Sequence, residues 1–240
     1  MFDKSILHNI LFLDIETVPQ YAEYNQLPEH WKKLWDKKAI TLKPDENQTP
    51  ADIYARAGIY AEFGKIVCIS VGGIYGKEQN HKLRIKSFYG ENEKQLLEEF
   101  AIFLTSDTNK TRLLCAHNGK EFDFPYLCRR MLINGIELPP ILNISGKKPW
   151  EVSHIDTMEI WKFGDYKSYT SLDLLASVFN IPTPKDDING SQVWSVYWID
   201  KDLERIKTYC QKDVVTIAQL VLKLCKEKPI QEEDINYATS

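Results

Sequence analysis

The sequence predicts a single α/β domain over residues 1–240, built as a mixed sheet of five strands flanked by helices. Three observations support this fold class. Strand-like segments come first, and the chain then alternates between helix-like segments and two further short strand-like ones. The apolar share of 43% and the aromatic share of 12% suffice for a packed core. The length of 240 residues suits one well-buried domain that carries a large insertion.

The first predicted strand is residues 10–15, a short apolar run that ends among carboxylates. A proline-containing stretch at about residues 18–63 follows it, with helix-like pieces near residues 29–38 and 51–60. This stretch is predicted to be a helical insertion in the domain.

Residues 65–75 and 82–89 are rich in strand-forming side chains, and the polar link between them predicts an antiparallel hairpin. Residues 91–104 carry apolar side chains at helical spacing behind an acidic first turn, which predicts an amphipathic helix. A crossover then leads to a strand at residues 111–116 and a helix at residues 124–134.

Residues 153–157 supply the fifth predicted strand, and residues 171–179 predict a helix opened by a serine cap. Residues 182–190 are predicted to form a loop. Apolar positions at helical spacing over residues 203–224 predict a long helix, which the charged tail after Lys226 ends. This order of elements is the one expected of a ribonuclease H-like domain.

Charge and composition limit the possible functions. A formal net charge of −4 argues against a protein that coats nucleic acid by bulk electrostatics, because that mode needs a surplus of Lys and Arg. It does not exclude an enzyme that holds a strand end through metal ions. No segment has the length of a membrane span, and the N-terminus has no signal-peptide core. Five dispersed cysteines without a CxxC pair predict reduced core thiols in a cytoplasmic protein.

The first candidate site is the pair Asp14 and Glu16, at the end of the first predicted strand. Side chains alternate faces along a strand, so these two carboxylates project to the same side. Like charges this close repel each other, and the arrangement becomes favourable when a divalent cation neutralises them. The alternative is an edge strand with a solvated acidic face.

Two further candidates lie later in the chain. Asp123 follows a turn, Asn118–Gly119, at the end of a predicted buried strand, although it could equally be a plain helix N-terminal cap. Tyr209 and Asp213 are four residues apart in the last predicted helix, which places them on one face beside its apolar stripe. The alternative for Asp213 is an exposed position at the edge of that stripe.

Together these motifs resemble the three exonuclease motifs of the DEDD (DnaQ-like) superfamily, in the subclass whose third motif contains Tyr (DEDDy). Residues 170–176, with the sequence TSLDLLA, look like the helix between the second and third motifs. The resemblance spans about residues 10–225 and points to stand-alone proteins similar to the exonuclease domain of family-B DNA polymerases. It implies a 3′→5′ exonuclease that acts on 3′ ends of single-stranded DNA and releases nucleoside 5′-monophosphates.

The resemblance also implies a metal-ligand set of four carboxylates, Asp14, Glu16, Asp123 and Asp213. They would hold two divalent ions, Mg²⁺ or Mn²⁺, because an all-oxygen site suits hard cations. Asp14 would bridge both ions, Glu16 and Asp213 would complete the site of the water-activating ion, and Asp123 would hold the other. Tyr209, with a reference pKa of about 10, is expected to orient the attacking water rather than to act as a base.

Thr17 and Asn118 are the predicted substrate-binding residues, since the family geometry would place both against the terminal nucleotide. Asp156 is expected to support the fold rather than to bind metal. Other candidates for contacts with the strand, each with an ordinary charged surface as the alternative, are Lys185 and the pairs Arg129–Arg130 and Lys147–Lys148.

Two other functions stay open. One is an RNA-directed exonuclease with the same chemistry, because nothing in the motifs distinguishes the 2′-hydroxyl. The other is a non-catalytic nucleic-acid-binding module of the same fold, against which the four intact carboxylates count. The sequence names no protein partner and no pathway.

Overall fold

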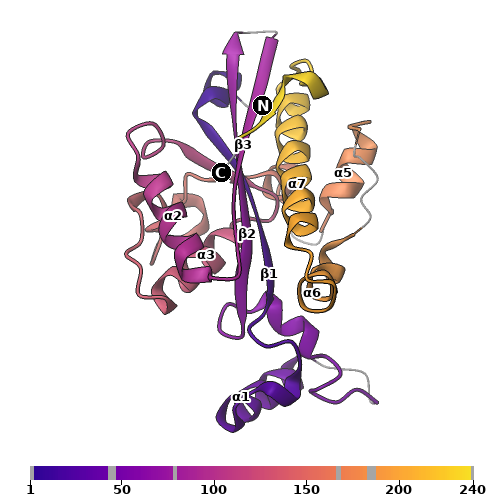
Figure 1. The fold of residues 1–240 in the computed structure, drawn as a ribbon. Coiled ribbons are helices and arrows are strands. Elements are labelled where there is room, and N and C mark those ends of the chain that lie inside the picture. The colour runs from indigo at the N-terminus through magenta and orange to yellow at the C-terminus, as the bar shows by residue number, and fades with distance from the viewer. Residues whose placement is uncertain (1–2, 43–46, 78–79, 166–168, 183–187, 239–240) are drawn as a thin grey trace.

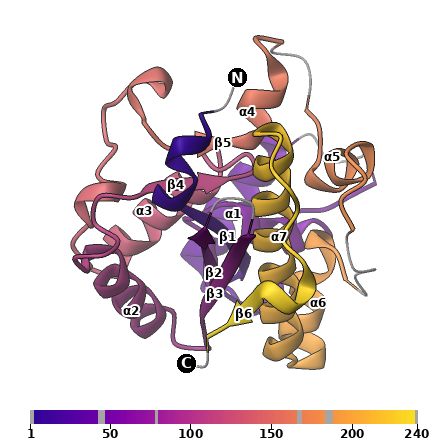
Figure 2. The ribbon, with the colours of Figure 1, turned by 90° about the horizontal axis from the view of Figure 1, so that it is seen from above.

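The computed structural model describes residues 3–42, 47–77, 80–165, 169–182 and 188–238. A central sheet carries helices on both faces (Figures 1 and 2). The predicted mixed α/β architecture is therefore confirmed, but the predicted count of five strands is wrong, because the described residues form a sheet of six in the order β5-β4-β1-β2-β3-β6. The strands are β1 Ile10–Pro19, β2 Gly64–Lys77, β3 Asn80–Tyr89, β4 Leu113–Ala116, β5 Ile155–Asp156 and β6 Ile235–Tyr237.

The sheet mixes both strand directions. β2 pairs antiparallel with β1 and with β3, as the predicted hairpin requires, whereas β4 and β5 run parallel to β1 and to each other. The additional strand, β6, has three residues and pairs parallel with β3. Its sequence lies in the charged tail and is too short for an alternating pattern, so only pairing with a distant strand reveals it.

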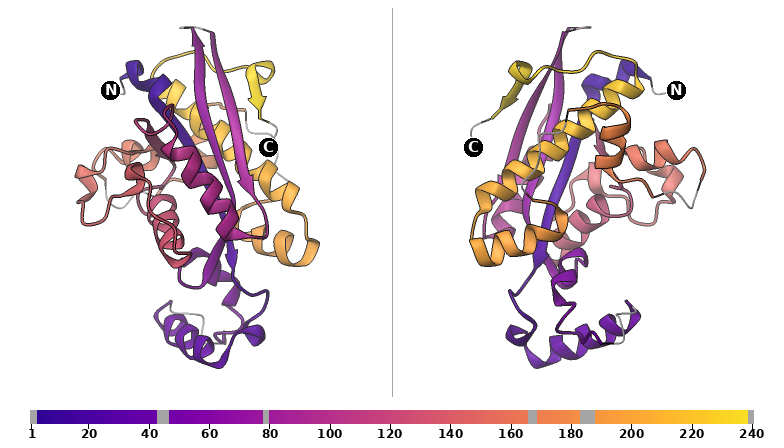
Figure 3. Two further views of the ribbon diagram at one scale, coloured as in Figure 1. Left: turned by 60° about the vertical axis from the view of Figure 1, so that its left-hand side comes forward. Right: turned by 90° about the vertical axis from the view of Figure 1, so that its right-hand side faces the viewer.

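Alternation along β1 explains the two helical layers. Leu11, Leu13 and Ile15 pack into a core beneath α2 (Glu93–Thr105) and α3 (Asp123–Ile133), while Ile10 and Phe12 pack into a core beneath α7 (Leu203–Leu224). Figure 3 shows α2 and α7 running along opposite faces of the sheet. The α-helices that follow the hairpin are α2 Glu93–Thr105, α3 Asp123–Ile133, α4 Thr157–Lys162, α5 Leu172–Val178, α6 Val193–Ser195 and α7 Leu203–Leu224.

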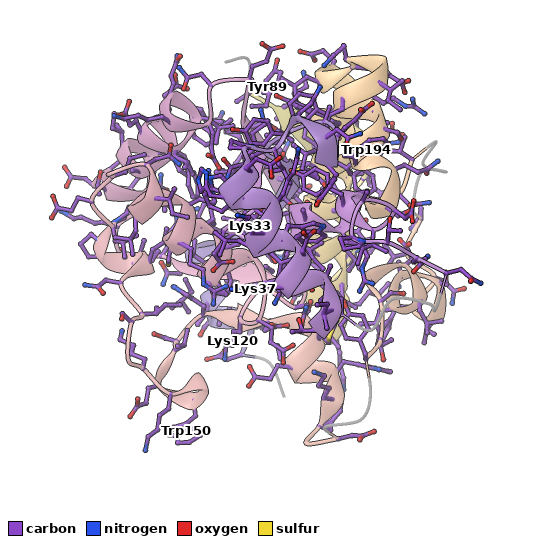
Figure 4. The ribbon with its side chains drawn as sticks, turned by 90° about the horizontal axis from the view of Figure 1, so that it is seen from below. Lys33, Lys37, Tyr89, Lys120, Trp150 and Trp194 are labelled. Atoms are coloured by element: carbon purple, nitrogen blue, oxygen red, sulfur yellow. The ribbon has the colours of Figure 1, made fainter. Side chains whose placement is uncertain are left out.

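The segment between β1 and β2 lies at one end of the sheet (Figure 1). It contains α1 Glu29–Thr41 and, where a second helical piece was expected, a 3₁₀ helix, Tyr54–Ile59. The buried Trp35 side chain packs edge-on against Tyr54, and its indole N–H donates to the Pro50 carbonyl at 2.8 Å. Figure 4 shows α1 lying across this end of the molecule, with Lys33 and Lys37 along it.

The longest helix, α7, begins where Asp202 accepts a hydrogen bond from the backbone N–H of Arg205 at 3.0 Å. Its buried stripe includes Val214, Ile217 and Val221, as the apolar spacing predicts. Of the helices that the structure describes, none is long and apolar enough to cross a membrane.

Candidate active site

Asp14 and Glu16 lie on the face of β1 that packs against α7. Asp14 is opposite Ser70 of β2, Glu16 is opposite Cys68, and a bulge follows Glu16. Glu16 is 7% exposed. Burial raises the pKa of both carboxyl groups well above the usual range, and the neighbouring carboxylates, including Asp213, raise them further.

The end of β4 makes room for the second motif. β4 stops at Ala116, so the stretch of β1 around Ile15 has no strand partner on that side among the described residues. The turn after β4 and the start of α3 occupy the space, and Asp123 is the first residue of α3. Burial raises the pKa of Asp123 to about 7, although hydrogen bonds from the backbone amides of Asp123 and Ile15 act in the opposite direction. The first and second motifs therefore meet here.

The third motif comes from α7 on the opposite side of β1. The Tyr209 hydroxyl is hydrogen-bonded to Asp213, and burial, followed by the charges of Asp213, Glu16 and Asp14, raises the pKa of Tyr209 far above its usual range. The phenol therefore keeps its proton at neutral pH. Charge interactions join Asp213 to Asp14, Glu16 and Asp123, so the structure brings together all five predicted catalytic residues.

The Asp14 carboxylate is incompletely satisfied by the protein. Its Oδ2 atom is buried and has no hydrogen-bond partner within the described part of the chain. An unpaired buried carboxylate is unfavourable unless it is neutralised, and hard divalent cations prefer carboxylate oxygen. The donor set of Asp14, Glu16, Asp123 and Asp213 therefore fits such a cation.

Cys210 is a residue of the site that sequence reasoning missed. Its sulfur lies within 4.8 Å of a carboxylate oxygen of both Asp14 and Glu16. Burial raises the pKa of this thiol well above its usual range, and Sγ donates to the Asp14 backbone carbonyl at 3.4 Å. Cys210 therefore packs against β1 as a protonated thiol. The only sequence indication was its position three residues before Asp213, on the same face of α7.

Asp156 holds the turn that leads to Asp123. Its carboxylate accepts hydrogen bonds from the backbone N–H groups of Asn118 at 2.9 Å and Lys120 at 3.0 Å, and it also caps α4. Asn118 has a left-handed backbone with φ of 63°, which Asn tolerates better than most residues. Asn118 lines a separate cavity of about 340 Å³, together with Lys120 and Lys147.

Thr17, the other predicted substrate contact, is bonded to a residue of α3. Its side chain is hydrogen-bonded to the Tyr126 hydroxyl, which donates to the Gly58 carbonyl at 2.7 Å. The prediction for Arg130 is wrong: this side chain is 4% exposed and forms an ion pair with Glu93, so it cannot belong to a strand-binding rim. Lys185 lies outside the described residues.

Residues 59–235 match the family described as "Predicted 3'-5' exonuclease related to the exonuclease domain of PolB". The chain belongs to this family. Exonucleases of this kind hydrolyse phosphodiester bonds in nucleic acid. The match includes Asp123, Tyr209 and Asp213 but begins after Asp14 and Glu16, whose place beside the other three comes from the structure.

The fold is similar to that of the family B DNA polymerase from the hyperthermophilic archaeon Pyrobaculum calidifontis. The TM-score is 0.58 at 18% sequence identity, and the similarity covers 90% of this chain and 24% of the polymerase chain. At this identity the likeness concerns the fold alone. The chain thus corresponds in length to about a quarter of the polymerase. No curated protein matches the sequence.

Proposed function

We propose that this protein is a metal-dependent 3′→5′ exonuclease of the DEDD superfamily, Tyr subclass, with a ribonuclease H-like fold. We propose further that residues 1–240 form one domain, with a helical insertion at about residues 18–63, and that it acts in the cytoplasm on 3′ ends of single-stranded DNA. The observation that carries the proposal is the cluster of Asp14, Glu16, Asp123 and Asp213, in which Glu16 and Asp123 are buried and a buried Asp14 oxygen has no hydrogen-bond partner among the described residues.

The four carboxylates would hold two divalent ions, Mg²⁺ or Mn²⁺. When bound, such ions lower the pKa of water and neutralise the charge that develops on the phosphate. The protein's own part is to hold these carboxylates on three rigid elements, β1, α3 and α7, so that little reorganisation is needed.

Tyr209 is proposed to orient the attacking water. Its raised pKa keeps the hydroxyl protonated, and a protonated phenol cannot accept a proton as a general base. The hydrogen bond to Asp213 fixes the hydroxyl beside the carboxylates. Nucleoside 5′-monophosphates would be released as water cleaves the terminal phosphodiester.

Asn118 and Thr17 are proposed to contact the terminal nucleotide. For Asn118, support comes from its position in the turn between β4 and Asp123, where it lines a cavity together with Lys147. For Thr17, support comes from its position directly after Glu16, although its hydroxyl also bonds to Tyr126.

The test uses purified protein with a 5′-labelled single-stranded DNA oligonucleotide and Mg²⁺, Mn²⁺ or chelator. We expect a ladder of products shortened from the 3′ end, with no ladder in chelator or in Asp14→Asn. The matched control is Asp107→Asn, because the Asp107 side chain is 94% exposed and pairs with Lys110 rather than with any residue of the cluster. This control should retain the wild-type rate.

An RNA oligonucleotide of the same sequence tests substrate choice. Faster cleavage of RNA would replace DNA as the proposed substrate while leaving the chemistry unchanged. Binding of either strand without cleavage would favour a non-catalytic module. Metal-independent products, or cuts inside the strand, would contradict the proposed reaction.

A further inference from the structure

A second cavity lies on the sheet face opposite the carboxylate cluster. Its volume is about 410 Å³, and it is lined by parts of β1, β2 and β3, the end of α2 and the segment between α2 and β4. Leu11 and Val71 line it, and both belong to the core beneath α2 rather than the core beneath α7. The sheet therefore separates this cavity from the candidate active site, as the opposite positions of α2 and α7 in Figure 3 indicate.

The lining of the cavity is positively charged. Arg84, Lys86 and Arg112 all line it, and no acidic residue does so within the described part of the chain. The Arg84 and Lys86 cations instead lie over aromatic rings, Arg84 over Tyr75 at 5.7 Å. Three cations around one cavity repel one another, so a bound anion would stabilise the arrangement.

Arg112 lies close against the sheet at Gly73. Partial burial lowers the pKa of its guanidinium, which means that the charged form is poorly hydrated there. Gly73 of β2 makes this position possible: a Cβ atom at Gly73 would lie 2.7 Å from Nη1 of Arg112. A glycine inside a strand often marks such a close approach. The guanidinium therefore occupies space that any other residue at position 73 would restrict.

Two aromatic rings complete the walls. The Tyr75 hydroxyl accepts a hydrogen bond from the Asn236 side chain at 2.8 Å, and the Phe103 ring packs against Phe88 with their centroids 5.4 Å apart. Both rings are thus held in place. The cavity volume lies within the range of roughly 300–1,000 Å³ typical of small-molecule sites, far above the needs of a lone phosphate.

We propose that this cavity binds a nucleotide, with its phosphate on Arg84, Lys86 and Arg112 and its base against Tyr75 or Phe103. Guanidinium groups bind phosphate through paired hydrogen bonds, and aromatic rings stack on bases of any sequence. The nucleotide has two possible sources: a free mononucleotide, or one unit of a strand. The site is independent of the proposed nuclease reaction, since none of the clustered carboxylates lines it.

The test is calorimetric titration of AMP and dAMP in chelator, with Asp14→Asn as the common background so that the active site contributes no metal-dependent binding. We expect Arg112→Gln and Lys86→Gln each to weaken binding about tenfold or more, because each removes a charged hydrogen-bond donor. The matched control is Lys110→Gln, which changes a lysine in the same segment that does not line the cavity. It should bind like the background protein. Gly73→Val provides a second probe, since it fills the space occupied by Arg112.

The remaining ligands identify what is recognised. Inorganic phosphate and adenosine should each bind more weakly than AMP, because each supplies only half of the contacts. If AMP does not bind but a single-stranded oligonucleotide does, and if its binding is lost in Arg112→Gln, the site recognises a nucleotide within a strand. Equal affinity for phosphate and AMP would overturn the nucleotide assignment. The assignment would also fail if the Arg112→Gln and Gly73→Val variants bound both AMP and the oligonucleotide as tightly as the background protein.

Discussion

The protein buries acidic side chains in two regions whose surroundings differ. Glu93 accepts hydrogen bonds from the Ile66 backbone at 2.7 Å and from Arg130 Nε at 2.8 Å, and its other oxygen is also bonded to Arg130. Glu16 is buried and Asp14 is partly buried, yet both face other carboxylates and their pKa values are raised. A buried acid paired with a cation serves the fold, whereas a group of acids that face one another is suited to bind a cation.

The Glu93–Arg130 pair connects four parts of the chain. Arg130 of α3 bonds to Glu93 of α2 and donates to the Ala61 carbonyl at 2.8 Å, at the end of the segment between β1 and β2. Glu93 in turn holds the start of β2 through Ile66. This network fixes the ends of the elements around the site without entering the site itself.

The largest effect on stability is expected from breaking the pair. Arg130→Met leaves the Glu93 carboxylate buried without its cation, and we expect the free energy of unfolding to fall by about 3–5 kcal/mol. Urea denaturation measures this change. The neighbouring exposed Arg129 provides the control, because Arg129→Met should stay within roughly 0.5 kcal/mol of wild type. Equal effects of the two substitutions would show that the pair does not stabilise the fold.

At the cluster of Asp14 and Glu16, a substitution is expected to raise the free energy of unfolding rather than lower it. In chelator, Asp14→Asn removes one of several mutually repelling buried charges, so the free energy of unfolding should rise by about 1 kcal/mol while activity is lost. Added Mg²⁺ should raise the melting temperature of wild type more than that of the variant. A loss of stability in chelator comparable to that of Arg130→Met would contradict the contrast between the two regions.

The clustered carboxylates should also make the stability of the protein depend on pH. In the metal-free protein the pKa of Asp123 is about 7, above its ordinary value of 3.8, so the folded state binds more protons between these limits. The free energy of unfolding should therefore fall as pH rises from about 4 to about 7. Urea midpoints at pH 5 and pH 8 in chelator measure this slope, and Asp123→Asn should make it shallower, with the raised pKa values of Asp14 and Glu16 supplying the remainder. An unchanged slope in the variant would remove Asp123 as its source.

The smallest effect is expected at Cys210. Cys210→Ala removes the weak hydrogen bond to the Asp14 carbonyl and should cost about 1 kcal/mol. Because the thiol is protonated and hard cations prefer oxygen, the Mn²⁺ concentration for half-maximal activity should not change. A several-fold increase in that concentration would make Cys210 a metal ligand.

Local patterns were sufficient for much of the fold. The hairpin of β2 and β3, the capped helix α2 and the long helix α7 follow from periodicity and from turn residues, which act over a few neighbouring positions. β6 and the burial of Arg130 could not be predicted in this way. β6 exists because it pairs with β3, and Arg130 is buried because Glu93, 37 residues away, supplies its counter-charge.

The sequence by itself determined which side chains can form the site. Alternation along β1 places Asp14 and Glu16 on one face, and helical spacing places Tyr209 near Asp213. Only the tertiary structure decided that they converge. β4 ends early enough for Asp123 to reach the edge of β1, and α7 crosses the sheet where Cys210 contacts Asp14. These contacts join residues far apart in the chain, so their geometry depends on how the whole core packs.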